Sequence, residues 1–458
     1  MNSTLKKNIL QKTKKYLPHM VEAEQYIWSH PQTGFHEWDA HNYLVEKFLK
    51  LGFEVTEVGD IPGFYFDIDS GKEGPTIAIL GELDAIILAE HPDCDPKTSA
   101  VHACGHHFQS SALLGIAGVL SEDEVLSELC GKIRIVAVPA EELIELGQRA
   151  QMRADGKIKY ISGKSEFMRR GCFDDVDIAI MLHETDGNTS GLRIIAGTSG
   201  IIAKRVVFCG SENVSGAQPK NGVNALYAAQ TAMTAINALR ETFPHNQNVR
   251  VQSVITEGGA SVQFIPARVV IESNIRAYDY KVLIDVNEKV NRAFSAAAVA
   301  MGAEVIIEDM EMYIPEDNSR IPELVDVAYQ AGCEMFGIEN SHKNLDRSRV
   351  SPGGTDMGNL GSVIPTIQPH LISPGTKGHC KDFHANNPEE TVFNHAAVLV
   401  IMSCLLLENQ AEKSKKILSE FKPIFSSIEE CCEELDKIYK VKNAVEYCEE
   451  GCAKLRWI

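Results

Sequence analysis

The chain has 458 residues, more than one compact core normally supports, so two domains are expected. Its 44% hydrophobic and 23% charged residues are typical of a globular protein. The formal net charge of -19 argues against a nucleic-acid partner, and no apolar run reaches the length that crosses a membrane. The opening residues show no secretory signal pattern, so the expected compartment is the cytoplasm, with the cysteines as reduced thiols or metal ligands.

The first part of the chain alternates helical and strand-like patterns. Helical patterns cover residues 20–51 and 110–120. Strand-like apolar runs occupy residues 53–58, 76–80, 133–138 and 178–182. This alternation predicts an α/β fold with a mostly parallel central sheet, in which functional side chains gather beyond the carboxyl ends of the strands.

A second pattern begins near Gly197 and has the order strand, helix, strand, strand, helix, strand. Its elements are expected at residues 201–209, 224–241, 249–255, 269–277, 282–301 and 303–307. This order predicts a ferredoxin-like α+β domain, which is inserted because α/β character resumes after it. We therefore expect a catalytic domain from residues 1–195 and 313–458, an inserted domain over residues 196–312, and a charged helical tail from Ala411.

The segment His102-Ala-Cys-Gly-His-His107 carries the densest chemical signal. Cys104 and His106 are good ligands for a borderline-soft divalent ion, and Gly105 lets the backbone fold around it. The same cluster is also compatible with a buried thiol beside hydrogen-bonded histidines. By itself the segment therefore leaves metal binding open.

Two adjacent carboxylates, Glu141 and Glu142, follow an apolar strand pattern. Such a pair usually lies in solvent at the start of a helix. Beside a metal ion, however, one carboxylate can bind the ion while the other takes a proton from the bound water. His183 ends another buried-looking strand, and a lone histidine at such a position is more often structural than a ligand.

Short motifs follow one another along the chain in a characteristic order. They are Trp28-Ser-His-Pro-Gln-Thr-Gly-Phe-His-Glu37, Gly81-Glu-Leu-Asp-Ala85, His102-Ala-Cys-Gly-His106, Pro139-Ala-Glu-Glu142, Met181-Leu-His183, Gly222-Val-Asn-Ala-Leu226, Ile265-Pro266, Arg276-Ala277, Gly354-Thr-Asp-Met-Gly358, Gly378-His379 and Phe383. In this order they resemble the family of metallopeptidases and amidohydrolases that includes aminoacylases, glutamate carboxypeptidases and indole-acetyl-amino-acid hydrolases. The resemblance is greatest to the aminobenzoyl-glutamate hydrolase and dipeptidase-like amidohydrolase group.

The resemblance implies a zinc-peptidase-like catalytic domain with an inserted lid that also forms a homodimer. It implies that two divalent ions are held by Cys104, His106, Glu142, His183 and His379, with the Cys104 thiolate as the bridge. Zinc suits these ligands best, although manganese, cobalt or nickel is also compatible with them.

The resemblance also implies catalytic and substrate-binding roles. Glu141 would be the general base and then the acid, and Asp84 would orient a metal ligand. Arg276 would hold a substrate carboxylate, unless it is simply a surface arginine, and Thr355 would also contact the substrate. The implied reaction is hydrolysis of an amide bond in an N-acyl amino acid, a dipeptide or an aminobenzoyl-glutamate-like small molecule by metal-activated water.

Two positions depart from the family pattern. His107 stands where relatives usually have Asp or Asn, and we expect it to line the substrate pocket or to support a ligand. Relatives also carry a lid histidine shortly before the proline that corresponds to Pro219, and this chain has none there. That histidine is expected to stabilise the oxyanion across the dimer, and loss of one oxyanion donor typically costs about a hundredfold or more in rate. Either another group such as Gln263 or Asn213 substitutes for it, or the reaction has unusual needs, or the activity is weak.

An apparent insertion over residues 146–170 is rich in lysine and arginine. Such a run is usually a solvated face, but its place after Glu142 leads us to expect a role at the pocket mouth, where it would attract an anionic substrate. Two alternatives to a general amidohydrolase are an enzyme dedicated to one specialised metabolite and a metal-binding dimer that acts as a scaffold. The presence of Glu141 together with all five implied ligands favours catalysis.

Overall fold

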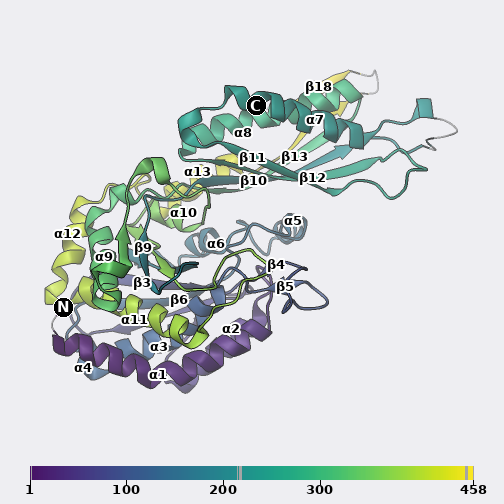
Figure 1. Cartoon of the computed structure of the whole chain (residues 1–458). Coiled ribbons are helices and arrows are strands. Elements are labelled where there is room, and N and C mark those ends of the chain that lie inside the picture. Colours follow the sequence, from purple (N-terminus) through teal and green to yellow (C-terminus); the bar gives the residue numbers. More distant parts are fainter. Residues whose placement is uncertain (2, 214, 216–218, 449–451, 457–458) are drawn as a thin grey trace.

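The computed structural model describes residues 1–458 except 2, 214, 216–218, 449–451 and 457–458. The chain forms two lobes, a larger one that contains the N-terminal helices and a smaller one here called the second lobe (Figure 1). The second lobe is an antiparallel sheet whose strands lie between residues 200 and 313 and at residues 440–447 and 453–455, with helices on its outer face.

A six-stranded sheet forms the centre of the larger lobe, in the order β1-β2-β6-β3-β7-β15. Its strands are β1 (Thr56–Glu57), β2 (Phe64–Asp69), β3 (Thr76–Glu82), β6 (Lys132–Val138), β7 (Ile178–Ile180) and β15 (Thr366–Ile367). The pairs β6–β3, β3–β7 and β7–β15 are parallel, whereas β1–β2 and β2–β6 are antiparallel. The α/β fold with a mostly parallel core is therefore confirmed.

Both faces of this sheet are covered, because every residue of β3 is buried. One face packs against three helices, α1 (Ser3–Ser29), α3 (His106–Leu120) and α11 (Pro388–Leu407). Within the described part of the chain, α11 is the one helix long and apolar enough to cross a membrane. Because 89% of the most apolar 18-residue stretch of α11 is buried inside the protein, its apolar composition is explained by its place in the core.

The N-terminal region differs from the single helix expected over residues 20–51. It contains α1 and a separate helix, α2 (Trp38–Lys50), joined by a turn. The turn includes Pro31, which cannot donate a backbone hydrogen bond, and Gly34, where an added Cβ would lie 2.8 Å from the Cβ of Ala140. The strand expected at residues 53–58 is reduced to β1.

The second lobe has the ferredoxin-like order that the sequence predicts. Its elements are β10 (Gly200–Cys209), α7 (Ala225–Leu239), β11 (Arg250–Glu257), β12 (Arg268–Ala277), α8 (Tyr280–Met301) and β13 (Glu304–Tyr313). The strands lie in the order β11-β12-β10-β13, and all three pairs are antiparallel. Helices α7 and α8 lie on the face turned away from the larger lobe (Figure 1).

The C-terminal segment was expected to be helical, and this is wrong beyond residue 439. Two helices, α12 (Glu412–Glu420) and α13 (Ile428–Ile438), are followed by β17 (Lys440–Tyr447) and β18 (Ala453–Leu455). β17 pairs antiparallel with β13, and β18 pairs with β17. An unpaired β13 would expose a row of backbone donors and acceptors, so the final segment covers this edge of the second lobe's sheet.

The remaining elements surround the ends of the central strands. They are α4 (Asp123–Leu126), α5 (Leu146–Ala154), α6 (Gly163–Arg169), α9 (Pro322–Phe336), α10 (Met357–Gly361), β4 (Ile86–Ile87), β5 (Ala100–Val101), β8 (His183–Thr185), β9 (Gly191–Ile194), β14 (Ser341–Lys343) and β16 (His370–Ile372). A small sheet has the order β14-β9-β16-β8 and places His370 opposite His183.

If the C-terminal segment is part of the core, Leu435→Ala in α13 will destabilise the protein. Leu435 is fully buried in the hydrophobic cluster that extends into the second lobe, and such truncations cost about 2–5 kcal/mol. We expect a lower denaturant midpoint for Leu435→Ala, and a change within about 0.5 kcal/mol for Leu455→Ala, whose side chain is 47% exposed. Equal midpoints for the two variants would contradict this packing.

Candidate active site

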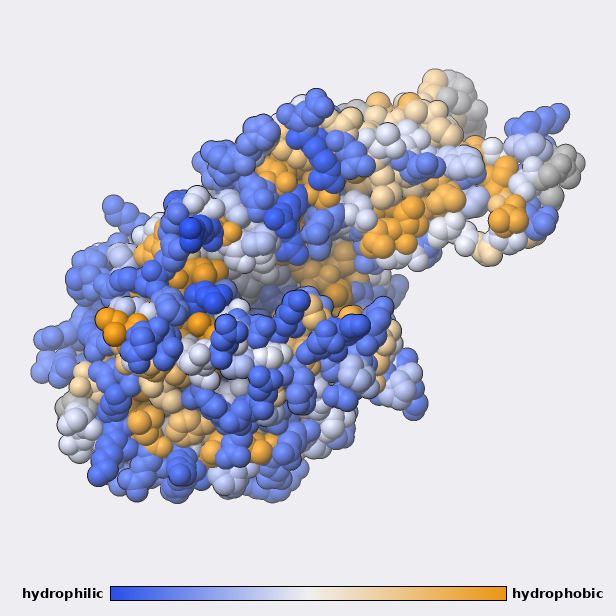
Figure 2. Space-filling model, viewed as in Figure 1, coloured by the Kyte–Doolittle hydropathy of each residue, from blue (hydrophilic) through white to orange (hydrophobic). Residues whose placement is uncertain are grey.

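A cavity of about 820 Å³ lies between the two lobes. Segments that are distant in the sequence line it, including Glu141 and Glu142 after β6, Arg276 on β12 and His379 before α11. Figure 2 shows the recess between the lobes from the same side as Figure 1. β3 and β6 are parallel, so their carboxyl ends meet at one edge of the sheet, and this edge is where the cavity opens.

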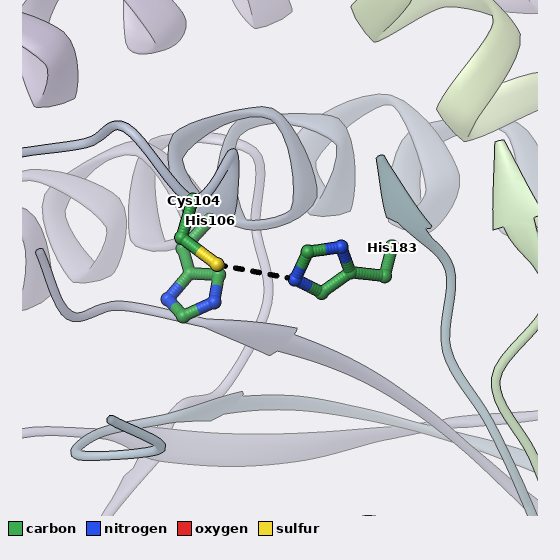
Figure 3. A group of neighbouring side chains, drawn as sticks. All are labelled: Cys104, His106 and His183. Atoms are coloured by element: carbon green, nitrogen blue, oxygen red, sulfur yellow. Dashed lines mark hydrogen bonds between the residues drawn. The ribbon is translucent and has the colours of Figure 1, made fainter. Parts of the chain in front are cut away.

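Three of the predicted ligands, Cys104, His106 and His183, form one group. Their donor atoms all lie within 4.8 Å of one another. The Sγ of Cys104 is 3.3 Å from Nε2 of His183, and the rings of His106 and His183 are perpendicular. In Figure 3, the Cys104 and His106 side chains at the start of α3 and the His183 side chain point toward one another.

The other two predicted ligands complete a second group with the same thiol. The donor atoms of Cys104, Glu142 and His379 also lie within 4.8 Å of one another. Nε2 of His379 is 3.3 Å from Sγ of Cys104 and 2.9 Å from Oε1 of Glu142. Cys104 belongs to both groups, so all five residues predicted as ligands surround one sulfur atom.

The backbone and a buried carboxylate hold this arrangement in place. Gly105 has a positive φ of 95°, and an added Cβ there would lie 2.8 Å from a carboxylate oxygen of Glu184. Asp84 accepts hydrogen bonds from Nδ1 of His106 at 3.0 Å and from the backbone N–H of Glu142 at 2.9 Å. Asp84 thus contacts two of the clustered residues, and its role in orienting a metal ligand stays a prediction.

This donor set fits divalent metal ions. Thiolate, imidazole and carboxylate together are typical ligands of zinc and similar ions. Nε2 of His106 is buried and makes no hydrogen bond with the described residues, so its lone pair is available to bind an ion. Burial alone would raise the pKa of the Cys104 thiol, but the neighbouring His106 and His183 lower it to about 6, which favours the thiolate.

Glu141 lies beside the cluster and forms a third group of donors with Glu82 and His106. Burial, and then the carboxylates of Glu82 and Glu142, raise the pKa of Glu141 well above its usual range. The sequence placed Glu82 beyond a strand end, where functional residues collect, but gave it no role in the site. The available signal was its position at the end of an apolar strand, two residues before Asp84.

Two of the residues predicted to bind substrate, Arg276 and Thr355, line the cavity. Nη1 of Arg276 donates a hydrogen bond to the carbonyl of Pro352 at 3.1 Å, which orients the guanidinium at the cavity wall. Asn274 lines the cavity as well and was not predicted. Because alternate residues of a strand share one face, its position could have been inferred once Arg276 was placed on a strand.

His107 lies outside this cavity, which differs from the substrate contact expected for it. Its buried ring contacts Trp28, and its Nε2 is 3.6 Å from a carboxylate oxygen of Glu24. Together these residues line a separate cavity of about 440 Å³ on the other side of α3. His106 and His107 are consecutive residues of one helix and therefore point in different directions.

Gln263 also lies away from the cavity of its own chain. It is exposed in the loop between β11 and β12, where its backbone carbonyl accepts a hydrogen bond from the backbone N–H of Ser215. The missing lid histidine is expected to act across the dimer, so a contribution of Gln263 to the site of a partner copy stays a prediction.

The basic segment over residues 146–170 does not form the pocket mouth. Arg169 and Arg170 both pair with the buried Glu166, and Lys164 is fully buried. All residues of this segment are described, and none of them lines the cavity. The expectation that Arg169 and Arg170 attract an anionic substrate is therefore wrong, because their charges are neutralised within the fold.

Residues 78–403 match Peptidase family M20/M25/M40, and the chain therefore belongs to this family of hydrolases. The Xaa-Arg dipeptidase of Mus musculus is 28% identical over 75% of this chain and 74% of its own length. One of the p-aminobenzoyl-glutamate hydrolase subunits of Escherichia coli is 26% identical over 68% of each chain. A solved Bacillus subtilis structure, described as a dinuclear metal binding peptidase, shares the fold with a TM-score of 0.59 at 18% identity, over 86% of this chain and 99% of that one.

The orienting role of Asp84 can be tested with Asp84→Asn. The amide keeps the shape of the side chain but removes the charge that faces His106, and loss of such a supporting group typically weakens metal binding about 10- to 100-fold. Asp177→Asn is the matched control, because Asp177 caps a strand end of the same sheet by accepting a hydrogen bond from the N–H of Thr76. Metal affinity measured by chelator competition should fall only for Asp84→Asn, and equal affinities in both variants would refute the role.

Proposed function

We propose that this protein is a metal-dependent amidohydrolase that cleaves an amide bond in a small molecule. The observation that carries the proposal is the convergence of Cys104, His106, Glu142, His183 and His379 around one thiol, with Glu141 beside them. The substrate class is an N-acyl amino acid, a dipeptide or an aminobenzoyl-glutamate-like compound, in keeping with the names of the mouse and bacterial relatives.

We propose that the five clustered residues hold two divalent ions, with zinc as the best match and manganese, cobalt or nickel as alternatives. Cys104 would contribute to both sites because it belongs to both groups of donors. Ions bound there would lower the pKa of a coordinated water and polarise the scissile carbonyl. The supporting Asp84 would keep the ring of His106 in the tautomer with Nδ1 protonated and Nε2 free.

Glu141 is the proposed general base and acid. Its carboxylate takes a proton from the attacking water and later delivers it to the departing nitrogen of the amide. Glu141 is buried. The O–H of Tyr313 donates a hydrogen bond to the backbone carbonyl of Glu141 at 2.5 Å, and this bond holds the backbone of Glu141 in place. Cations bound nearby would lower the raised pKa of Glu141 and so favour the ionised carboxylate that a general base requires.

Arg276 and Thr355 are the proposed substrate-binding residues. Arg276 reaches the cavity from β12, so the second lobe would hold a substrate carboxylate while the larger lobe carries out the chemistry. We also propose that the second lobe acts as a lid, that it joins two copies of the chain into a homodimer, and that the enzyme works in the cytoplasm. The division at residues 1–195, 196–312 and 313–458 remains part of this proposal, with residues 440–447 and 453–455 in the second lobe's sheet.

The variant Glu141→Gln separates metal binding from catalysis. It should keep the metal content of the wild-type protein and lose about 10²- to 10⁴-fold in turnover, because the amide cannot accept the proton. The assay is release of free amine from a panel of N-acyl amino acids, dipeptides and p-aminobenzoyl-glutamate. Metal-loaded Glu141→Gln with wild-type turnover would eliminate the base assignment, and a wild-type protein inactive on the whole panel would eliminate the proposed substrate class.

The variant Arg276→Gln tests the carboxylate contact. A hydrogen-bonded charge pair is worth about 1.5–3 kcal/mol, so kcat/KM for a carboxylate-bearing substrate should fall about 10- to 100-fold. The same substrate with its carboxylate amidated should show little further loss in this variant. Arg250→Gln is the matched control, since Arg250 lies directly opposite Arg276 on β11 and does not line the cavity. Equal losses on both substrates would contradict the assignment.

A further inference from the structure

Glu82 is a fully buried carboxylate that the proposed mechanism leaves without a role. It is the last residue of β3, and its two oxygens have different neighbours. Oε1 accepts a hydrogen bond from Nζ of Lys164 at 2.5 Å. Oε2 accepts one from Nε2 of Gln109 at 3.0 Å and lies 3.1 Å from Nε2 of His106. One oxygen is thus held by a cation, and the other faces a predicted metal ligand.

The contact between Glu82 and His106 is not an ordinary hydrogen bond. Nδ1 of His106 bonds to the carboxylate of Asp84, so in the neutral ring the proton lies on Nδ1 and Nε2 carries the lone pair. Nε2 makes no hydrogen bond, although Oε2 of Glu82 is within reach. In this neutral tautomer both atoms are buried acceptors, and one cation bound between them would satisfy both.

The spacing of the two atoms also matches that of ligands on one ion. Ligand atoms bound at about 2.0–2.1 Å in a tetrahedral site lie about 3.3 Å apart. The 3.1 Å between Oε2 of Glu82 and Nε2 of His106 is close to this value. It also falls within the range of the other clustered pairs, which are 3.3 Å for Cys104 and His183 and 2.9 Å for Glu142 and His379.

A buried ion pair fixes Glu82 in this position. Nζ of Lys164 contacts Oε1 of Glu82 and also Oδ1 of Asp356, at 2.6 Å, and all three side chains are fully buried. The backbone N–H of Lys164 donates to the other oxygen of Asp356 at 2.9 Å. Because Lys164 occupies Oε1, only Oε2 remains available on the side of His106. Lys164 belongs to the basic segment over residues 146–170, so one charge of that segment serves to hold Glu82 inside the fold.

We infer that Glu82 is an additional metal ligand, which binds through Oε2 to the ion held by His106, and that Lys164 and Asp356 position it. This inference rests on the metal centre proposed above. It adds a sixth protein ligand to the five expected ones and places a lysine at the far side of the carboxylate. Lys164 also offsets part of the negative charge that Cys104, Glu82 and Glu142 bring together.

The test is cobalt binding by purified full-length protein that has been stripped of metal and reloaded with Co²⁺. Stoichiometry, the two affinities from chelator competition, and the visible spectrum with its thiolate-to-cobalt band are measured. The variants are Glu82→Gln, which removes the charge, and Glu82→Asp, which keeps the pair with Lys164 and withdraws the carboxylate from His106. Glu311→Gln is the matched control, because Glu311 is another fully buried glutamate that accepts backbone N–H groups away from the cluster.

We expect the wild-type protein to bind two cobalt ions, and both Glu82 variants to lose about tenfold or more in affinity at one site, with a changed spectrum. Glu311→Gln should match the wild type. Two ions bound by the Glu82 variants with unchanged affinity and spectrum would overturn the inference and leave the metal centre intact. A wild-type protein that binds no cobalt would overturn the metal centre itself. If Glu82→Gln does not fold, Glu82→Asp decides the question.

Discussion

The close approach of electron-donating groups around Cys104 is the constraint on which the rest of the structure depends. A thiol with a lowered pKa, two carboxylates and three imidazoles are held within a few ångströms of one another, and Cys104, Glu82 and His106 among them are buried. Such a cluster is costly unless cations occupy its centre. The fold supports it through rigid parts, because the strand ends deliver Glu82 and Glu142, and α3 begins at His106.

The sequence was sufficient to predict the residues whose spacing is set by local structure. Cys104 lies in the turn before α3 and His106 is the first residue of that helix, whereas Glu141 and Glu142 lie shortly after the buried strand β6. Their proximity to the sheet edge therefore follows from the order of elements. The ferredoxin-like order of the second lobe was also predictable, because each of its strands and helices has a clear hydrophobic pattern. The resemblance to a known family then supplied His379, which no local pattern marks.

Features that depend on tertiary contacts were not predictable in the same way. Lys164 meets Glu82 across a sequence separation of 82 residues, and the many charges around it in the sequence indicated a solvated face instead. His107 differs from His106 only in the direction of its side chain around the helix, which decides the cavity that it lines. The segment that forms β17 has a charged composition, and its strand conformation arises from pairing with the open edge of β13.

X-ray absorption spectroscopy of the protein loaded with two equivalents of zinc tests the central claim most directly. If Cys104 is shared by both groups of donors, each zinc should have one sulfur neighbour at about 2.3 Å and nitrogen or oxygen neighbours at about 2.0–2.1 Å. A spectrum that contains only nitrogen and oxygen neighbours would contradict the account, because it would place the ions away from the one thiol around which the site is built.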